Sequence, residues 1–234
     1  MIKDYIAFDL ETTGLRVEED DIIEIGAVKV RNGKVCDRFI EFLKPTKTIS
    51  SLVTSITGIT NEMVSNARDT EQIIIDFMLF CADDVLVGHN IMFDYKFMKT
   101  YAKKYGFSFE KRGIDTLKIA RKAVPSLPSK KLEDLCLHYQ IINQAAHRAY
   151  HDALATAKVY HMLAHDYEMI FPDLFIPNIL NYKPPKKQPC TKKQLLFLES
   201  LCETHHIPFP KGAEDFTRSE ASRYIDRIIS KEIL

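Results

Sequence analysis

Hydrophobic and polar positions follow two different patterns along this chain, and the change between them predicts its architecture. In the first 45 residues, apolar positions form short runs or alternate with polar ones, as is typical of β-strands. The pair Asn32-Gly33 separates the second run from the third and is a strong two-residue hairpin signal. The pattern therefore predicts an antiparallel meander with strands at residues 5–8, 22–30 and 35–43.

From residue 51 onward, apolar positions follow helical spacing, with a short apolar run and a short extended piece between the helical segments. The run at residues 85–87 is predicted to be a buried strand, and residues 113–116 lead from the extended piece into the next helix. Because these extended segments alternate with helices, they are expected to be parallel, which indicates an α/β domain with a mixed sheet flanked by helices. The predicted helices cover residues 51–58, 60–64, 71–81, 91–105, 116–123, 132–139 and 152–167.

The character of the chain changes after residue 171. Five prolines fall between residues 172 and 189, together with three lysines. Proline lacks an amide donor and stiffens the chain, so residues 172–190 are predicted to be a linker after a domain at 1–171. Helices at residues 192–202 and 219–229 then predict a small helical module at 191–234, with Thr191 and Thr217 or Ser219 as candidate caps.

The function of this C-terminal module is open from its sequence. At roughly 45 residues it is close to the size below which isolated domains are marginal, so we expect it to pack on something. A nucleic-acid grip, a polymerase and a second copy of the chain are all compatible with it. Residues 194–198 have a weak similarity to sliding-clamp peptides, but the spacing differs and the same residues suit a helix. Clamp binding is therefore not expected.

Composition excludes several classes of protein. The chain has 234 residues, 46% of them hydrophobic, and no apolar run approaches the ~18 residues that a membrane span needs. Residues 1–4 lack the features of a signal peptide, so a cytoplasmic location is expected. The five cysteines are widely spaced without a C-x-x-C pair, which argues against a disulfide scaffold and against a structural zinc site.

Charge is balanced overall but unevenly distributed. The formal net charge is zero, whereas residues 95–131 hold eleven Lys and Arg against two acids, a local charge of +9. Such runs are often only solvated faces. Beside a carboxylate site, however, a basic segment suits a phosphodiester substrate.

Two acids follow the first predicted strand. Asp9 and Glu11 are two residues apart, so on an extended chain their side chains point the same way. Two carboxylates this close repel each other unless a positive charge lies between them. Hard divalent cations prefer carboxylate oxygens, so the pair is a candidate metal site. The alternative is an exposed strand end with two solvated acids.

Two further acids and a histidine stand at helix starts. Asp94 lies in the first turn of a predicted helix and Asp152 begins the long one, where the helix dipole alone would favour an acid. His147 precedes Asp152 on a predicted loop and is free to reach a water molecule near bound metals. His151 competes for this role, but its position at the helix entry favours an orientation away from the site.

These residues carry a family resemblance. The stretches FDLETTGL, GHNIMFD and HRAYHD resemble, in this order, the three motifs of the DEDDh exonucleases, which include the proofreading epsilon subunit of bacterial DNA polymerase III. The five-residue step from His147 to Asp152 matches the histidine variant of the family and favours His147 over His151. The stretches IIEIGAVKV, SITGITNEMV and IDTLKIAR are also similar, and the resemblance covers about residues 1–168.

The resemblance implies a ribonuclease-H-like fold and a metal-dependent 3′–5′ exonuclease that releases nucleoside 5′-monophosphates. It implies that two divalent cations, Mg²⁺ or Mn²⁺, bind four carboxylates, and that His147 acts as general base, because an unperturbed histidine titrates near ~6.5. Single-stranded DNA 3′ ends are favoured over RNA, and a polymerase subunit is a candidate partner. An exoribonuclease and an inactive end-binding module remain alternatives. The implied metal ligands are Asp9, Glu11, Asp94 and Asp152, and the candidate substrate contacts are Thr12, His89, Asn90 and Phe93.

Overall fold

The computed structural model describes residues 1–184 and 189–231. The chain divides into two compact units, Met1–Pro184 and Pro185–Leu234. Each unit is described by itself below.

Unit 1 is built on a mixed sheet. Its described residues form six strands in the order β3-β2-β1-β4-β5-β6. β1 pairs with β2 antiparallel and with β4 parallel, and β4 continues parallel to β5. The predicted combination of an antiparallel meander with parallel strands is therefore confirmed. The strands are β1 (Tyr5–Thr12), β2 (Ile22–Arg31), β3 (Lys34–Phe42), β4 (Leu86–Gly88), β5 (Arg112–Asp115) and β6 (Asn178–Ile179).

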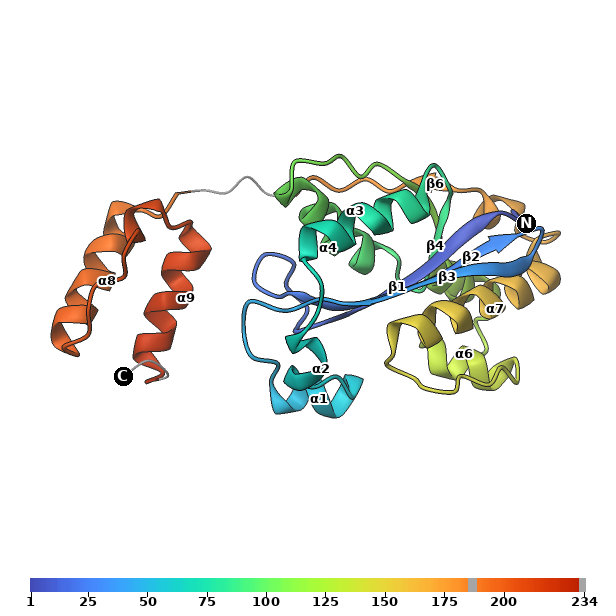
Figure 1. The fold of residues 1–234 in the computed structure, drawn as a ribbon. Coiled ribbons are helices and arrows are strands. Elements are labelled where there is room, and N and C mark those ends of the chain that lie inside the picture. Colours follow the sequence, from blue (N-terminus) through green and yellow to red (C-terminus); the bar gives the residue numbers. More distant parts are fainter. Residues whose placement is uncertain (185–188, 232–234) are drawn as a thin grey trace. The chain divides into compact units, whose positions relative to one another are not determined.

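Helices cover both faces of this sheet, because the side chains of β1 alternate between two buried clusters. Ile6 and Phe8 pack with residues of α3 and α4, whereas Tyr5 and Ala7 pack with residues of α5, α6 and α7. Figure 1 shows α3 and α4 on one side of the strands and α6 and α7 on the other. The helices of unit 1 are α1 (Ser51–Thr57), α2 (Asn61–Ser65), α3 (Thr70–Cys81), α4 (Met92–Lys104), α5 (Thr116–Ala123), α6 (Leu132–His138) and α7 (Ala149–Tyr167).

Two elements are longer than the sequence pattern predicts. β1 continues past Phe8 to Thr12, because its polar end still pairs with β2, with Glu11 opposite Glu24. α7 begins at Ala149 rather than at Asp152. The candidate acids of β1 therefore lie within a strand, and Asp152 lies within the first turn of its helix.

The predicted linker at residues 172–190 requires a correction. Residues 172–175 form a 3-10 helix and β6 pairs antiparallel with β5, so this segment is structured. Phe175 and Leu180 are buried in the two clusters that flank β1. The many prolines indicate local stiffness, but they do not prevent the apolar side chains between them from packing. The unit boundary falls after Pro184, and residues 185–188 of the expected linker lie outside the described residues.

Unit 2 contains the predicted pair of helices, α8 (Lys192–Thr204) and α9 (Arg218–Ile229). Each begins with a reciprocal capping box, Thr191 with Gln194 and Thr217 with Glu220, which satisfies amides at the helix start. The helical appendage predicted from the sequence is therefore confirmed, although its last three residues, 232–234, are not described. Its small core consists of Leu198, Cys202, Ala213, Ile225 and Ile228.

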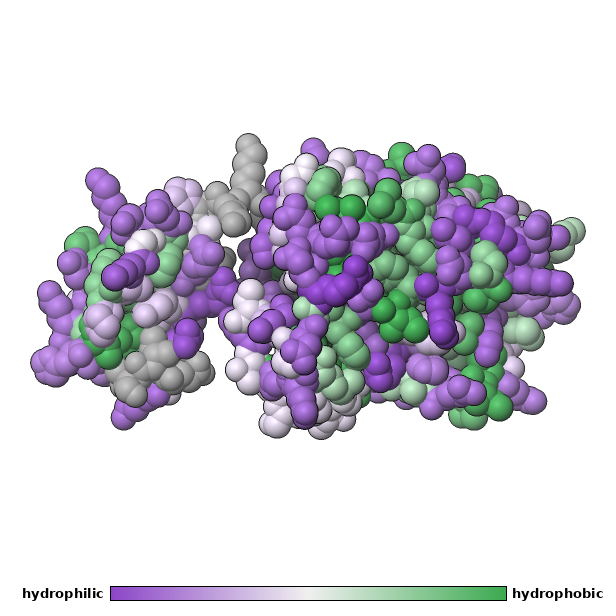
Figure 2. Space-filling model, viewed as in Figure 1, coloured by the Kyte–Doolittle hydropathy of each residue, from purple (hydrophilic) through white to green (hydrophobic). Residues whose placement is uncertain are grey.

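The face of the molecule drawn in Figure 2 is mainly polar. Figure 2 shows hydrophilic side chains predominating on this face, with hydrophobic ones in separate small groups. Across residues 1–184 and 189–231, no helix combines the length and the apolar character needed to cross a membrane.

Candidate active site

The site begins at the end of β1. Asp9 and Glu11 occupy alternate positions of this strand and share the side of the sheet that α7 covers. Across the ladder, Asp9 lies opposite Gly26 and Glu11 lies opposite Glu24 on β2. Strand pairing therefore fixes the backbone that carries both carboxylates.

Asp94 joins the same end of the sheet from α4. It is only 3% exposed, and its Oδ1 accepts a hydrogen bond of 3.1 Å from the backbone N–H of Leu10. Leu10 stands between Asp9 and Glu11, so this bond attaches the start of α4 to the strand at the position of the two other acids.

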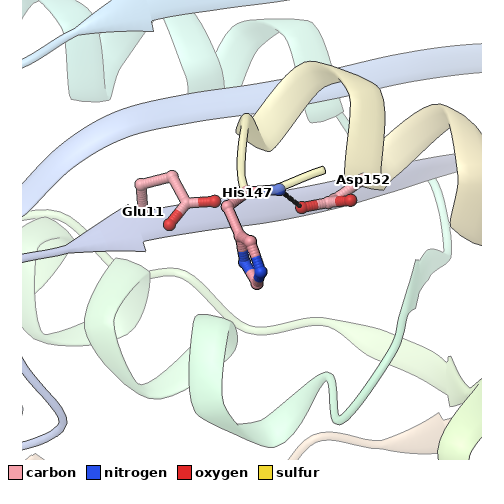
Figure 3. Close-up of side chains that lie close together, drawn as sticks. All are labelled: Glu11, His147 and Asp152. Carbon is pink, nitrogen blue, oxygen red and sulfur yellow. Dashed lines mark hydrogen bonds between the residues drawn. The ribbon is translucent and has the colours of Figure 1, made fainter. Parts of the chain in front are cut away.

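Asp152 comes from the first turn of α7, and two donors hold its two oxygens. The Nδ2 of Asn143 donates to Oδ1 at 2.6 Å, and the backbone N–H of His147 donates to Oδ2 at 2.8 Å. His147 has a φ of 61°, in the left-handed region that non-glycine residues rarely adopt. This turn aims its N–H at Asp152, and Figure 3 shows the imidazole extending away from α7.

These side chains border one pocket of about 750 Å³. The pocket brings together all four candidate metal ligands, His147, and three of the four candidate substrate contacts. Thr12 is not in its lining, and the Thr12 hydroxyl donates to the Gly14 carbonyl within the turn. His151 is also outside the lining, and its ring packs against Tyr150. The predicted residues in the lining are Asp9, Glu11, His89, Asn90, Phe93, Asp94, His147 and Asp152.

Comparison with known proteins decides the family. Residues 6–160 match the family model RNase_T, whose description is "Exonuclease". The chain belongs to this exonuclease family. The match confirms the resemblance to DEDDh-type exonucleases that the three motifs carry, and it identifies the protein as a nuclease.

Curated relatives of this exonuclease include much longer proteins. A PolC-type DNA polymerase III from Caldanaerobacter subterraneus subsp. tengcongensis is 41% identical over 157 residues, which cover 67% of this chain and 11% of the relative. A PolC-type DNA polymerase III from Halalkalibacterium halodurans is 31% identical over 237 residues, covering 97% of this chain and 16% of the relative. The chain thus spans about one tenth to one sixth of the length of these relatives.

Solved structures share the fold of the exonuclease unit. E. coli exonuclease I in complex with a dT13 oligonucleotide has a TM-score of 0.67 at 20% identity, covering 74% of this chain and 44% of that one. A 3′-exonuclease whose structure shows recognition of a histone mRNA stem-loop has a TM-score of 0.59 at 19% identity, covering 70% and 83% of the two chains. At such identities the likeness shows the fold alone, and it confirms the predicted ribonuclease-H-like sheet.

The four candidate metal ligands that line the pocket repel one another and are partly or fully buried. Burial raises the pKa of Asp9 well above its ordinary value, and the charges of Asp94, Asp152 and Glu11 raise it further. Burial, followed by the charges of Asp152 and Glu24, raises the pKa of Glu11 to about 8. Burial also raises the pKa of Asp94 to about 8, against the hydrogen bond from Leu10. Gathering these carboxylates is therefore unfavourable unless protons or cations neutralise them.

The donor set fits hard divalent cations. Glu11, His147 and Asp152 each offer a ligand atom, and these atoms lie within 4.8 Å of one another. Asp9 and Asp94 line the same pocket and add further carboxylate oxygens, which are the ligands that Mg²⁺ and Mn²⁺ prefer. Burial raises the pKa of Asp152 as well, although the bonds from Asn143 and His147 oppose the shift. A cation in the pocket would therefore reduce the repulsion among all four carboxylates.

The turn before α4 is latched by polar contacts to the end of β5 and to the first residue of α5. The Nδ1 of His89 lies 2.9 Å from the Thr116 hydroxyl, and the backbone N–H of Asn90 donates to Asp115 Oδ1 at 3.0 Å. Asn90 has a φ of 67°, so a second pocket residue holds a left-handed conformation. These contacts hold His89 and Asn90, two candidate substrate contacts, against β5 and α5.

Sequence reasoning missed the attachment of α7 to the sheet. Glu24, 1% exposed, accepts hydrogen bonds from Arg148 Nη2 at 2.8 Å, from Arg148 Nε at 3.1 Å and from the Ala149 N–H at 3.0 Å. At Gly26, an added Cβ would lie 2.0 Å from the backbone nitrogen of Tyr150. A glycine and an acid inside the apolar run of β2 were signals of close approach and of a buried ion pair. Asn143, which holds Asp152, has no comparable signal in the sequence.

Proposed function

We propose that this chain is a metal-dependent 3′–5′ exonuclease that removes nucleoside 5′-monophosphates from DNA 3′ ends. The observation that carries the proposal is the convergence of four carboxylates, from β1, α4 and α7, on one pocket that His147 also lines. Membership of the exonuclease family supports the reaction type. The direction of degradation and the metal dependence are part of the proposal.

In the proposed reaction, water attacks the terminal phosphorus and the bond to the 3′ oxygen of the preceding nucleotide breaks. When bound, two divalent cations would supply the positive charge that the four acids require and would acidify the attacking water. His147 accepts the proton of that water, which its exposed imidazole at the pocket edge allows. The two donors on Asp152 keep that carboxylate in place during the reaction.

The substrate contacts follow from the pocket lining. Phe93 is half-buried against Phe97, with the ring centroids 5.1 Å apart, and it also lines the pocket, so it can stack on the terminal base. His89 and Asn90 flank the same wall and would contact the terminal sugar or phosphate. Thr12 would act through its turn rather than through its hydroxyl, which is bonded to Gly14.

DNA is proposed as the substrate because the relatives are DNA polymerases and exonuclease I binds an oligonucleotide of dT. The structural likeness to a 3′-exonuclease that recognises an mRNA stem-loop keeps an exoribonuclease as the second candidate. The PolC-type relatives also favour a proofreading or repair role beside a polymerase. The expected cytoplasmic location stays a prediction.

The test is a product analysis with matched DNA and RNA oligonucleotides labelled at the 5′ end, with Mn²⁺, with Mg²⁺ and with EDTA. The proposal predicts a ladder that shortens from the 3′ end, release of 5′-monophosphates, and no reaction in EDTA. Faster loss of RNA would favour the exoribonuclease. Binding without cleavage under any metal condition would favour an inactive end-binding module.

A further inference from the structure

The pocket has a second wall of opposite charge. The acids come from β1, α4 and α7, whereas Arg121 of α5 and the pair Lys130 and Lys131, which precedes α6, line the same pocket. These three cations belong to the basic segment at residues 95–131, whose other eight Lys and Arg do not line the pocket. The fold therefore places three cations of the basic segment in the same pocket as the carboxylates.

We propose that Arg121, Lys130 and Lys131 form a phosphate-binding wall for the nucleotides on the 5′ side of the scissile bond. The inference rests on the proposed exonuclease function, because it assigns a place to the strand that enters the pocket. A nucleic acid strand presents one negative charge per nucleotide. Only the terminal phosphodiester can meet the acids and their cations, so the next phosphates need fixed positive charge within the same pocket.

The local contacts of the wall leave its cations available. Lys130 Nζ donates to the Pro125 carbonyl at 3.3 Å and also to the Leu127 carbonyl, which holds the loop before α6 in shape. An ammonium group has three donors, so one remains for a phosphate oxygen. Lys131 lies 3.8 Å from Glu133, an acid that lines the same pocket, but both side chains are mostly exposed, so this pair is weak and a phosphate can displace it.

Arg121 lies beside the latched turn that carries His89. Burial lowers the pKa of the His89 imidazole; a hydrogen bond with the Lys130 backbone and the charge of Asp115 oppose this shift, and the nearby charge of Arg121 adds to it. The guanidinium is exposed on α5 and borders the pocket, and its planar fork suits two oxygens of one phosphate. The wall thus begins next to the candidate contacts for the terminal nucleotide and continues towards α6.

The experiment compares two double variants of equal charge change in the full-length chain. Arg121→Ala with Lys131→Ala removes two wall cations, and Lys130 is kept because it also holds the loop. The matched control is Lys118→Ala with Lys122→Ala, two exposed cations of the same helix that do not line the pocket. Binding of a 5′-fluorescein oligo(dT) is measured across a salt series with Ca²⁺, and the intact length of the oligonucleotide is checked afterwards.

The wall predicts that the first variant makes the negative slope of log affinity against log salt shallower by about 1.4, since each phosphate contact on a single strand contributes ~0.7 to its magnitude. The control should change this slope by less than about 0.3 and should keep wild-type hydrolysis. Neutral methylphosphonate linkages at the upstream phosphates should weaken binding to the wild type more than binding to the wall variant. Equal slopes for the two variants would overturn the wall.

Failure of the wall differs from failure of the proposed function. A wild-type chain that binds and degrades the oligonucleotide, combined with unchanged slopes, refutes only the wall. A wild-type chain that degrades neither DNA nor RNA with Mn²⁺ or Mg²⁺ refutes the exonuclease reaction itself.

Discussion

The two faces of the sheet in unit 1 are packed in different ways. On the face covered by α3 and α4, large aromatic side chains fill the core, with the rings of Phe8 and Phe77 5.8 Å apart. On the other face, at the end that carries the acids, α7 begins with the buried Ala149 and Ala153, and β2 contributes Gly26. The first face is filled by large side chains, whereas the acid-bearing end of the second face allows backbone to approach backbone. Farther along the second face, large rings such as Tyr5 and Tyr160 also pack.

This difference explains where the site lies. Short side chains such as Asp152 can reach the acids of β1 only if α7 lies close to the sheet, and small residues permit that distance. The close face also holds an ion pair between buried Glu24 and half-buried Arg148, and two residues in left-handed conformations border the pocket beside it. We infer that packing on the face covered by α3 and α4 stabilises the fold. This stability offsets the unfavourable free energy of holding the buried acids and the left-handed residues near α7.

The largest expected effect comes from removing a carboxylate on the close face. Asp152→Asn should reduce hydrolysis by roughly 10³-fold or more, because losing a metal ligand forfeits several kcal/mol of transition-state stabilisation. The variant keeps the shape of the side chain, so its free energy of unfolding should stay within about 1 kcal/mol of the wild type. Steady-state hydrolysis and thermal unfolding measure the two effects. Near-normal metal-dependent activity in this variant would show that Asp152 is not a metal ligand of the site.

The next effect separates two histidines at the start of α7. His147→Ala should reduce the hydrolysis rate by about 10²- to 10⁴-fold, the usual range for a general base, while Mn²⁺ still raises the unfolding temperature as in the wild type. His151→Ala is the matched control and should retain activity, since its ring packs on Tyr150 outside the pocket. A reversed pattern would assign the base to His151. Loss of Mn²⁺ binding in His147→Ala would make His147 a ligand instead.

A smaller effect compares the two faces directly. Glu24→Gln leaves Arg148, whose side chain is one-third exposed, without its carboxylate and should cost about 1.5–3 kcal/mol of unfolding free energy, the usual range for hydrogen bonds to a charged group. Phe77→Ala on the aromatic face should cost about 3–5 kcal/mol by opening a cavity. The account predicts that the folded fraction of Glu24→Gln loses about tenfold in activity, because α7 shifts, whereas that of Phe77→Ala does not.

Activity per folded molecule is obtained from hydrolysis rates divided by the folded fraction from circular dichroism. Arg148→Met, made alone and combined with Glu24→Gln, completes a double-mutant cycle, and the double variant should cost less stability than Glu24→Gln alone. If Glu24→Gln and Phe77→Ala lost the same activity per folded molecule, the ion pair would have only a structural role.

Sequence patterns predicted the features that depend on local periodicity. The strand alternation placed Asp9 and Glu11 on one face, and helical spacing with caps located most helices to within a few residues. The start of α7 was placed three residues late, because it depends on Glu24 and Gly26, more than 120 residues away in the chain. Proline content predicted a tether at residues 172–190, yet Phe175 and Leu180 pack into the core.

Convergence of the site was beyond the reach of local pattern. Nothing in the spacing of Asp94 or Asp152 shows that they meet Asp9, and only the resemblance of three ordered motifs implied it. Asn143 could not be found, because a loop asparagine has no distinguishing signal until the fold places it 2.6 Å from Asp152. The family resemblance supplied the site, and the structure supplied the contacts that hold it.

The most direct test of the account is the pH dependence of thermal unfolding with and without cations. Folded-state pKa values of about 8 for Glu11 and Asp94 stand above their ordinary values of 4.5 and 3.8. Protonated acids stabilise the folded state fully below the unfolded values, and that stability is lost as pH rises towards about 8. In EDTA, the unfolding temperature of the wild type should therefore fall between about pH 5 and pH 8, and Mn²⁺ should restore it most at pH 8. Asp94→Asn should weaken both responses. A wild-type unfolding temperature in EDTA that is flat or rises over this window, with no gain from Mn²⁺, would contradict the gathering of these acids into a cation site.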